Sequence, residues 1–449
     1  MSERAHPTRL LDVAPLAAVA RLAAPTTVVM AVSAVSNVVY TYFVSRLGVD
    51  AIGAVSLVFP VSLLAVTAMG GGIGAGATSA IARALGAGER HEAAALAGQA
   101  LVLAVALGLG FGVAAWLGVG TLFGLMGASG AVHEGATAFA RVLFGGVAIT
   151  FFGMMLDGVM RAEGNVRTPA TWATTSLVAQ MAVTPLFMFR FGWGLIGGAL
   201  AMLACQASAI VPRLFWVFGG RGAVRPALRS AHAGLDPVRE IVRVGVPAAL
   251  STSVNNVGLM VLTGVVARLG APDLAAYGLG TRLDFVLMSL AYGVGAAVLT
   301  LVGLAAGATR EDRIQEFVGH GVVIVVLLLA VPGLVVWWRP ALWLAMFSDD
   351  PGVLAVGSSY FRMIAPTYPF VGVSMVVAFA FQGLGRAALP LVVSIARIAA
   401  VLIAAIVSVR LGFDEHAVFL CIALGNVAGA IALGAIFVAT CRARVPTAR

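Results

Sequence analysis

Long apolar segments and short polar stretches alternate along the whole chain. Most of the apolar segments reach the ~20 residues that an α-helix needs to cross the hydrocarbon layer of a bilayer. About twelve such segments can be drawn, with edges good to roughly three residues. Their ranges are 22–45, 52–80, 93–117, 136–160, 170–190, 193–218, 240–267, 274–306, 317–338, 353–384, 387–409 and 415–441. The pattern therefore predicts an all-α integral membrane protein with about twelve transmembrane helices.

The composition excludes a soluble globular protein. Mean hydropathy is +1.02, 61% of the residues are hydrophobic and only 10% are charged. Soluble domains carry roughly 25% charged residues. A single soluble core could not hide so much apolar surface, whereas lipid replaces water around a membrane protein.

The arginines predict the orientation in the membrane. The chain contains no lysine, so its 28 basic residues are all arginine. If both termini face the cytoplasm, nineteen arginines lie in cytoplasmic segments, five lie outside and four lie within spans. The positive-inside rule supports this orientation. We therefore expect a multi-pass protein of the bacterial inner membrane, with the arginine-rich stretch 219–239 as a cytoplasmic linker.

The two halves of the chain repeat each other. "RLAAP" at 21–25 matches "RVGVP" at 243–247, and "SRLG" at 45–48 matches "ARLG" at 267–270, both at a separation of 222 residues. Six spans per half is an even number, so both halves enter the membrane with the same polarity. We expect two parallel six-helix lobes, residues 1–221 and 222–449, with a substrate site near the midplane between them.

Motifs along both halves resemble those of the multidrug and toxic compound extrusion (MATE) transporters of bacteria. They run in family order from about residue 20 to about residue 440. They include "VSRLGVDAIGAVSL", "GATSAIARALGAGERHEAAALA", "MRAEGNVRTPA", "VTPLFMFRFGWGLIGGALA", "IVRVGVPAAL", "GTRLDFVLMSLAYGVGAA" and "FQGLGRAALP". The resemblance implies antiport of H⁺ or Na⁺ against small amphipathic, often cationic compounds by alternating access. It implies no cofactor beyond the coupling ion. The expected partners are a small-molecule substrate and membrane lipids, not nucleic acid, and we expect a monomer.

The acids that carry coupling in the family are absent at the matching positions. The first-span aspartate of the family falls on Tyr40, and the fifth-span aspartate falls on Thr184. The asparagine that accompanies the latter falls on Gln180, and the seventh-span glutamate falls on Asn255. This departure leaves the fold expectation intact and favours protons over Na⁺ as the coupling ion.

Asp284 is the sharpest candidate for coupling. It lies about ten residues into its predicted span, roughly 15 Å deep at ~1.5 Å per residue. A charge at that depth requires a partner, water or a function. Protons and a cationic substrate could compete for this carboxylate, or it could form a structural ion pair with another helix, for example with Arg362. Arg282 is only two residues away and therefore points to a different helix face.

Asp157 and a set of polar side chains are further candidates. Asp157 has Arg161 at i+4, a spacing that favours a helix-end ion pair over a transport role. Glu163 follows in a loop, where we expect it to be solvated or capping. The first and seventh predicted spans carry polar stripes that line a cavity or bond between helices. The stripes are Ser33, Asn37, Tyr40 and Thr41 in one span, and Thr252, Asn255, Asn256 and Thr263 in the other.

Two other functions would each leave a different mark on the sequence. A flippase-like exporter of a lipid-linked or polysaccharide precursor would need a strongly cationic cavity, and the four arginines within spans leave that alternative open. An intramembrane enzyme would need paired acids, a His-rich metal motif or a Ser-Lys site, and the sequence contains none of these. Cys205, Cys421 and Cys441 have no metal-ligand spacing. We therefore expect neither an enzyme nor a metal site.

Overall fold

The computed structural model describes residues 7–227 and 236–443, and these residues form helices joined by short turns. Eleven helices in the described ranges are long and apolar enough to cross a membrane. The number rises to twelve if α5 and α6, bent by 44° at a break, count as one span. The predicted all-α fold of about twelve spans is confirmed. Four of the arginines expected on the cytoplasmic side lie outside the described residues, namely Arg4, Arg229, Arg444 and Arg449.

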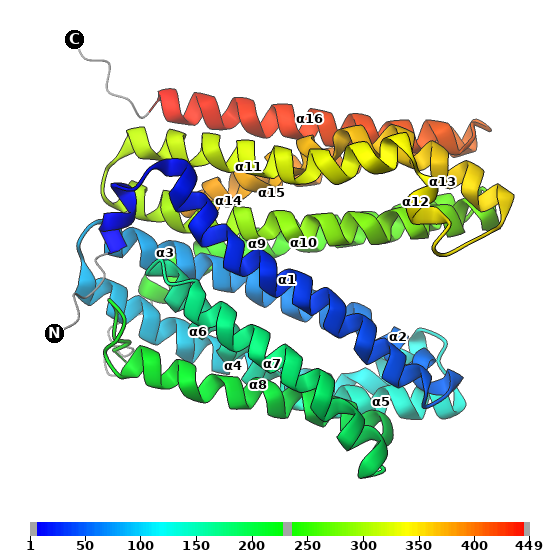
Figure 1. Cartoon of the computed structure of the whole chain (residues 1–449), viewed down its shortest axis with the longest axis horizontal. Helices are drawn as coiled ribbons and strands as arrows, with labels where there is room; N and C mark the ends of the chain where they lie inside the picture. The colour runs from blue at the N-terminus through cyan, green and yellow to red at the C-terminus, as the bar shows by residue number, and fades with distance from the viewer. Residues whose placement is uncertain (1–6, 228–235, 444–449) are drawn as a thin grey trace. The chain divides into compact units, whose positions relative to one another are not determined.

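The helices begin and end close to the predicted edges, because turns interrupt the apolar runs (Figure 1). In chain order they are η1 (Pro7–Leu11), α1 (Pro15–Ser45), α2 (Val49–Thr67), η2 (Ala68–Gly74), α3 (Ala75–Gly86), α4 (Arg90–Leu125), α5 (Gly130–Gly145), α6 (Val147–Ala162), α7 (Arg167–Pro185), η3 (Leu186–Arg190), α8 (Gly194–Phe218), α9 (Asp236–Val266), α10 (Ala271–Gly307), α11 (Glu311–Trp338), α12 (Ala341–Leu344), α13 (Pro351–Ile364), η5 (Ala365–Thr367), α14 (Tyr368–Gly383), α15 (Ala388–Arg410) and α16 (Glu415–Arg442).

The repeat seen in the sequence is also present in the backbone turns. Gly164, after α6, has φ 81° and Gly385, after α14, has φ 76°. Gly192, before α8, has φ 71° and Gly412, before α16, has φ 82°. These left-handed conformations favour glycine because it has no Cβ. Equivalent turns therefore end equivalent helices in the two halves.

The chain forms two compact units whose boundaries differ from the expected lobes 1–221 and 222–449. The N-terminal unit contains Met1–Leu10 and Val28–Ala249, and the C-terminal unit contains Leu11–Thr27 and Leu250–Arg449. The beginning of α1 thus belongs to the C-terminal unit, and the beginning of α9 belongs to the N-terminal unit.

Close helix packing explains this division. Gly293 of α10 lies so near the start of α1 that a Cβ on it would be 2.5 Å from Thr27 Oγ1. In the N-terminal unit, a Cβ on Gly76 of α3 would be 2.4 Å from the carbonyl oxygen of Ile241 in α9. Small residues permit such approach between membrane helices. The start of α1 therefore packs closely against Gly293 of the C-terminal unit, and the start of α9 packs closely against Gly76 of the N-terminal unit.

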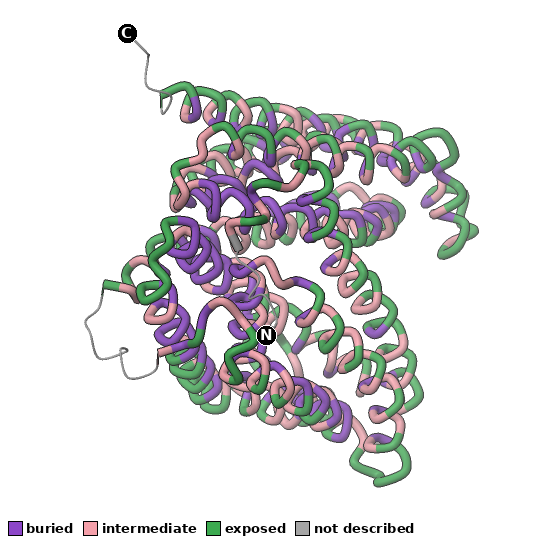
Figure 2. The backbone as a smooth tube through the Cα atoms, turned by 60° about the vertical axis from the view of Figure 1, so that its left-hand side comes forward, coloured by how far each residue is buried: buried purple, intermediate pink, exposed green. Residues whose placement is uncertain are grey.

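The C-terminal unit is built around α10. Of the apolar stretch of α10, 67% is buried, the largest share among the candidate spans, and α13–α14 follows with 56%. By contrast, only 11% of the stretch in α15 is buried. Figure 2 colours the chain by burial, and buried residues alternate with intermediate and exposed ones along the helices. A polar side chain on the buried face of α10 is therefore placed inside protein.

Glu163 holds the segment that follows α8. Its side chain is 8% exposed, and its carboxylate accepts hydrogen bonds from the backbone N–H groups of Ala223 (3.0 Å) and Val224 (2.9 Å). The expectation of a solvated side chain was wrong. The alternative is correct in that the carboxylate caps backbone N–H groups, here those of the segment after α8. The loop needs this acceptor because its N–H groups have no helical partner.

This contact predicts a pH dependence of stability. Burial raises the pKa of Glu163 to about 7 from its ordinary 4.5, although the two backbone N–H groups act in the opposite direction. A carboxyl group with a raised folded-state pKa favours the folded state below its unfolded pKa, and this contribution is lost as the pH rises through 7. We expect a loss of roughly 3 kcal/mol at most.

We expect Glu163→Gln to remove that dependence while retaining one acceptor oxygen. Thermal unfolding in detergent, followed over a pH series for both proteins, measures the difference. The two curves should converge at acidic pH, where wild-type Glu163 is also neutral, and separate as the pH rises. Curves that stay parallel throughout would show that Glu163 does not titrate in this range.

Candidate functional site

Asp284 is enclosed by two tyrosines from other helices. Tyr360 of α13 donates its hydroxyl proton to Oδ2, and Tyr368 of α14 donates to Oδ1, both at 2.7 Å. Each carboxylate oxygen therefore has a neutral donor, which replaces water in the helix bundle. The alternative of an ion pair with Arg362 is not what the structure shows, because Arg362 lies on an exposed position of α13 and the partners of Asp284 are the two tyrosines.

A second charge, Arg397 of α15, is held by two asparagines. Its Nη2 donates to Asn255 Oδ1 at 2.5 Å and its Nη1 donates to Asn426 Oδ1 at 2.9 Å. Asn255 in turn donates to the backbone oxygen of Ser251, and Asn426 donates to Thr367 Oγ1 at 3.1 Å. These bonds fix both amide groups with their oxygens toward the guanidinium.

Asp284 and Arg397 line one cavity of about 160 Å³ within the C-terminal unit. Its wall contains both asparagines that hold Arg397 and both tyrosines that hold Asp284. The remaining lining residues are mostly aliphatic: Leu259, Leu262, Met288, Ile364, Val371, Ile398, Val401 and Ile422, with Tyr277 and Thr281. No ion pair joins Asp284 to Arg397 in the described part of the chain.

The position of Tyr360 depends on close packing around its ring. The ring contacts Tyr277 and Phe419 edge-to-face, with centroids 5.8 Å and 5.2 Å away, and 1% of the residue is exposed. On the remaining side lies Gly280 of α10, where a Cβ would be 2.3 Å from the ring carbon Cε1. Gly280 thus lets the ring reach Asp284, one helical turn further along the same helix.

We expect Gly280→Ala to displace Tyr360 and to weaken its hydrogen bond to Asp284. The added methyl group overlaps a ring that is packed on its other sides, and overpacking of this kind costs about 1–3 kcal/mol. Transport should fall about tenfold, or more if Asp284 loses the donor completely. The measurement is transport per folded protein, with Gly278→Ala as the control, because a Cβ there meets nothing within 4 Å. Equal activity of the two variants would contradict the role given to Gly280.

Other predicted site residues of the C-terminal unit lie apart from Asp284. Arg282 lines a different pocket, of about 360 Å³, together with Leu274, Gly278 and Phe347. Asn256 is not part of the cavity lining, although its neighbour Asn255 is. The buried Nδ2 of Asn256 has no hydrogen-bond partner among the described residues. Asn255 is thus the residue of the seventh-span stripe that lines the cavity containing Asp284 and Arg397.

The neutral candidates from the N-terminal unit range from buried to exposed. The Tyr40 hydroxyl and Thr184 Oγ1 are buried without a hydrogen-bond partner among the described residues, and Gln180 is 7% exposed. Asn37 donates to the carbonyl oxygen of Ser33 in its own helix. In the described ranges, none of these groups forms a hydrogen bond with a carboxylate.

Asp157 forms an ion pair different from the expected one. Its Oδ1 lies 3.1 Å from Nε of Arg213 in α8, and the side chains are 18% and 7% exposed. The N–H is not aligned for a hydrogen bond, so the contact is electrostatic. The expected partner, Arg161, forms no ion pair with it in the described ranges. The pairing with Arg213 is what a structural ion pair requires, which is the role that the helix-end spacing favours over transport.

Sequence reasoning missed Arg397, Asn426 and the two tyrosines. Arg397 was one of four arginines within predicted spans, and its place near the middle of span 387–409 was the available signal. The positive-inside rule depends only on the number of arginines in each loop. It gives no information on which face of a helix an arginine within a span occupies. Tyr360 and Tyr368 carry no comparable signal, because a neutral side chain within a span does not require a charged partner as an arginine does.

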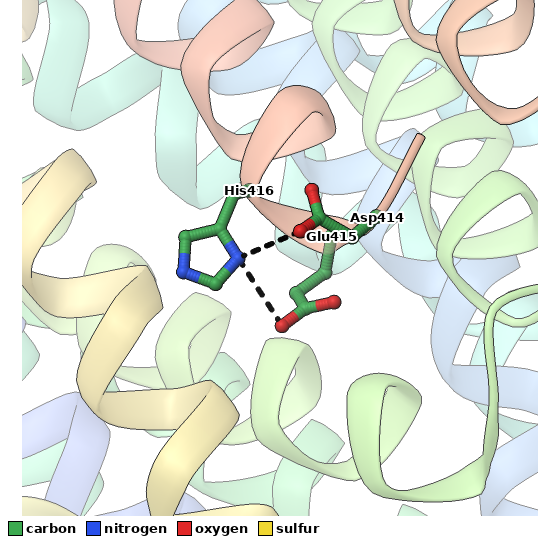
Figure 3. A group of neighbouring side chains, drawn as sticks. All are labelled: Asp414, Glu415 and His416. Atoms are coloured by element: carbon green, nitrogen blue, oxygen red, sulfur yellow. Dashed lines mark ion pairs between the residues drawn. The ribbon is translucent and has the colours of Figure 1, made fainter. Parts of the chain in front are cut away.

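Three neighbouring titratable side chains at the start of α16 do not form a ligand-binding site. The ring Nδ1 of His416 lies 3.5 Å from Asp414 and 3.3 Å from Glu415, and the three side chains point toward one another (Figure 3). The side chains of His416 and Asp414 are 51% and 66% exposed. Consecutive residues at a helix start meet in this way without a ligand, so we assign no function to them.

Comparisons with known proteins place this architecture. A relative from Shewanella oneidensis described as an FAD transporter is 24% identical over 371 residues, 80% of each chain. The probable multidrug resistance protein YpnP of Bacillus subtilis is 26% identical over 253 residues, 56% of each chain. A MOP superfamily transporter from Pyrococcus furiosus has a similar fold, with a TM-score of 0.93 and 24% identity over 99% of this chain and 100% of its own.

The MatE family model matches each half of the chain once. The matched residues are 25–186 and 247–407, which together cover most of the sequence. These two matches reproduce the repeat found in the sequence and in the turns. The chain therefore belongs to the MatE family of multidrug and toxic compound extrusion (MATE) membrane transporters.

Proposed function

We propose that this transporter exports small amphipathic compounds in exchange for protons, and that Asp284 carries the proton. The observation that supports this most strongly is a partly buried carboxylate, held by Tyr360 and Tyr368, on the wall of a cavity in the C-terminal unit. When ionised, this group attracts a cation, and when protonated it does not. A proton and the cationic group of a substrate then exclude one another.

The surroundings of Asp284 favour a proton over Na⁺. A bound metal ion needs several oxygen ligands in addition to one carboxylate. Both asparagine side-chain oxygens in this cavity, those of Asn255 and Asn426, accept hydrogen bonds from Arg397. The fixed positive charge of Arg397 also repels a second cation. A proton needs only the carboxylate itself.

The cavity wall supports an amphipathic substrate. Aliphatic side chains surround the two charged groups, so an apolar body with a polar group fits it better than a hydrated ion does. Curated relatives are described as multidrug resistance or multidrug export proteins. We place the transporter in the bacterial inner membrane with both termini in the cytoplasm, working by alternating access.

Efflux from proteoliposomes tests the coupling ion. The purified full chain is reconstituted, loaded with a fluorescent lipophilic cation and exposed to an imposed pH gradient or an imposed Na⁺ gradient. We expect the pH gradient to drive transport and the Na⁺ gradient to leave it at the rate seen without a gradient. Transport driven by Na⁺ alone would overturn the proposal.

A second candidate is the export of a flavin nucleotide. It is favoured by Arg397, whose guanidinium suits an anionic group, and by the relative described as an FAD transporter. The same vesicles loaded with FAD distinguish the two candidates. A lipid-linked precursor has less support, because Arg397 is the one arginine among the residues that line this cavity.

A further inference from the structure

We infer that the cavity of the C-terminal unit recognises an amphipathic zwitterion, with a cationic group at Asp284 and a carboxylate at Arg397. The inference rests on the proposed function in that it names the substrate class of the same site. It begins from two opposite charges that share one cavity without forming an ion pair.

Each charge is kept in place by neutral groups and retains free bonding capacity. A guanidinium has five N–H donors, and two of those of Arg397 are used, by Asn255 and Asn426. Each oxygen of Asp284 accepts one hydrogen bond and can accept about one more. Both groups can therefore bind a ligand without breaking their present contacts.

Charge balance selects the zwitterion. A purely cationic ligand at Asp284 leaves Arg397 without an anion, and a purely anionic ligand at Arg397 leaves Asp284 without a cation. An unpaired charge among mostly aliphatic walls is unfavourable. The cavity wall contains one guanidinium, that of Arg397, and one carboxylate, that of Asp284. A ligand that carries one charge of each sign is therefore complementary to both.

The proton still competes with such a ligand, which keeps the exchange mechanism. The titratable or charged groups that line the cavity beside Asp284 are Tyr277 from α10, Tyr360 from α13, Tyr368 from α14 and Arg397 from α15. α9 and α16 contribute neutral groups to the wall. Asp284 is the carboxylate of the wall, so its protonation removes the one negative charge and expels the cationic end of the ligand.

Three ring compounds that differ in charge test the inference. They are para-aminomethylbenzoate, a zwitterion, benzylamine, a cation, and benzoate, an anion, and a one-ring body suits a cavity of about 160 Å³. Binding to the purified full chain in detergent is measured by isothermal titration calorimetry at neutral pH. We expect the zwitterion to bind about tenfold or more tightly than either singly charged compound.

Variants assign each end of the ligand. Arg397→Gln should reduce zwitterion binding about tenfold to hundredfold, to the level of benzylamine. Asp284→Asn should reduce it to the level of benzoate. Arg410→Gln is the matched control, because Arg410 ends the same helix in an exposed position, and it should bind like wild type. Acidification should weaken the zwitterion and benzylamine but not benzoate.

Wild-type protein that binds the three compounds equally would overturn the inference, and that comparison needs no variant to fold. Unchanged zwitterion binding in Arg397→Gln would also overturn it. The zwitterion site and the proton coupling can fail separately, and the experiments distinguish the two failures. A charge preference without pH-driven efflux overturns the coupling alone, and pH-driven efflux without a charge preference overturns the zwitterion site alone.

Discussion

Asp284→Asn is expected to abolish pH-driven export while the protein stays folded. Asparagine has nearly the same shape as aspartate and keeps an oxygen that accepts a hydrogen bond from Tyr360 or Tyr368. It cannot take up or release a proton, and it does not attract a cation. An interaction with a charged group contributes about 1.5–3 kcal/mol, so we expect pH-driven efflux to fall by about tenfold to hundredfold.

The measurement is the initial rate of efflux from proteoliposomes under a pH gradient, normalised to folded protein. Asp349→Asn is the matched control, because Asp349 is exposed and lies in the turn before α13. The control should export at the wild-type rate. If Asp284→Asn also exports at that rate, Asp284 does not carry the proton.

The second large effect concerns the ion pair between Asp157 and Arg213. Removal of one partner leaves an uncompensated charge in the N-terminal unit, which costs about 3–5 kcal/mol. Asp157→Asn and Arg213→Met should therefore each lower the temperature of unfolding markedly. The double variant contains neither charge, and we expect it to recover most of the lost stability.

Thermal unfolding in detergent of the wild type, both single variants and the double variant completes this cycle. Transport per folded protein should be close to wild type in the double variant, because the pair is structural. Additive destabilisation would mean that the two charges do not interact. Loss of transport in Asp157→Asn without loss of stability would favour the alternative in which Asp157 takes part in coupling.

The positions of the membrane helices could be predicted because the bilayer demands long apolar runs. The predicted segment 415–441 became α16 (Glu415–Arg442), and 193–218 became α8 (Gly194–Phe218). The bend at Gly146 could not be predicted, since apolar residues continue through it. The family resemblance is confirmed by the MatE match. Members of this family are transporters, so the prediction that the chain is not an enzyme is also confirmed.

The candidate site was predicted only in part, because burial of a charge can be seen in a sequence but its partners cannot. Asp284 was identified as an acid deep in a span, and Asn255 as a polar group on another. Tyr360 and Tyr368 lie 76 and 84 residues from Asp284, and only helix packing brings them together. Arg397 was overlooked for the same reason, since its two asparagines come from α9 and α16.

Proton release on ligand binding tests most directly whether Asp284 is shared between proton and substrate. The purified protein is titrated with para-aminomethylbenzoate in weakly buffered detergent solution, at a pH acidic enough for Asp284 to be protonated. The account predicts release of about one proton per bound ligand in the wild type and none in Asp284→Asn. Binding without proton release in the wild type, or equal release in the variant, would contradict it.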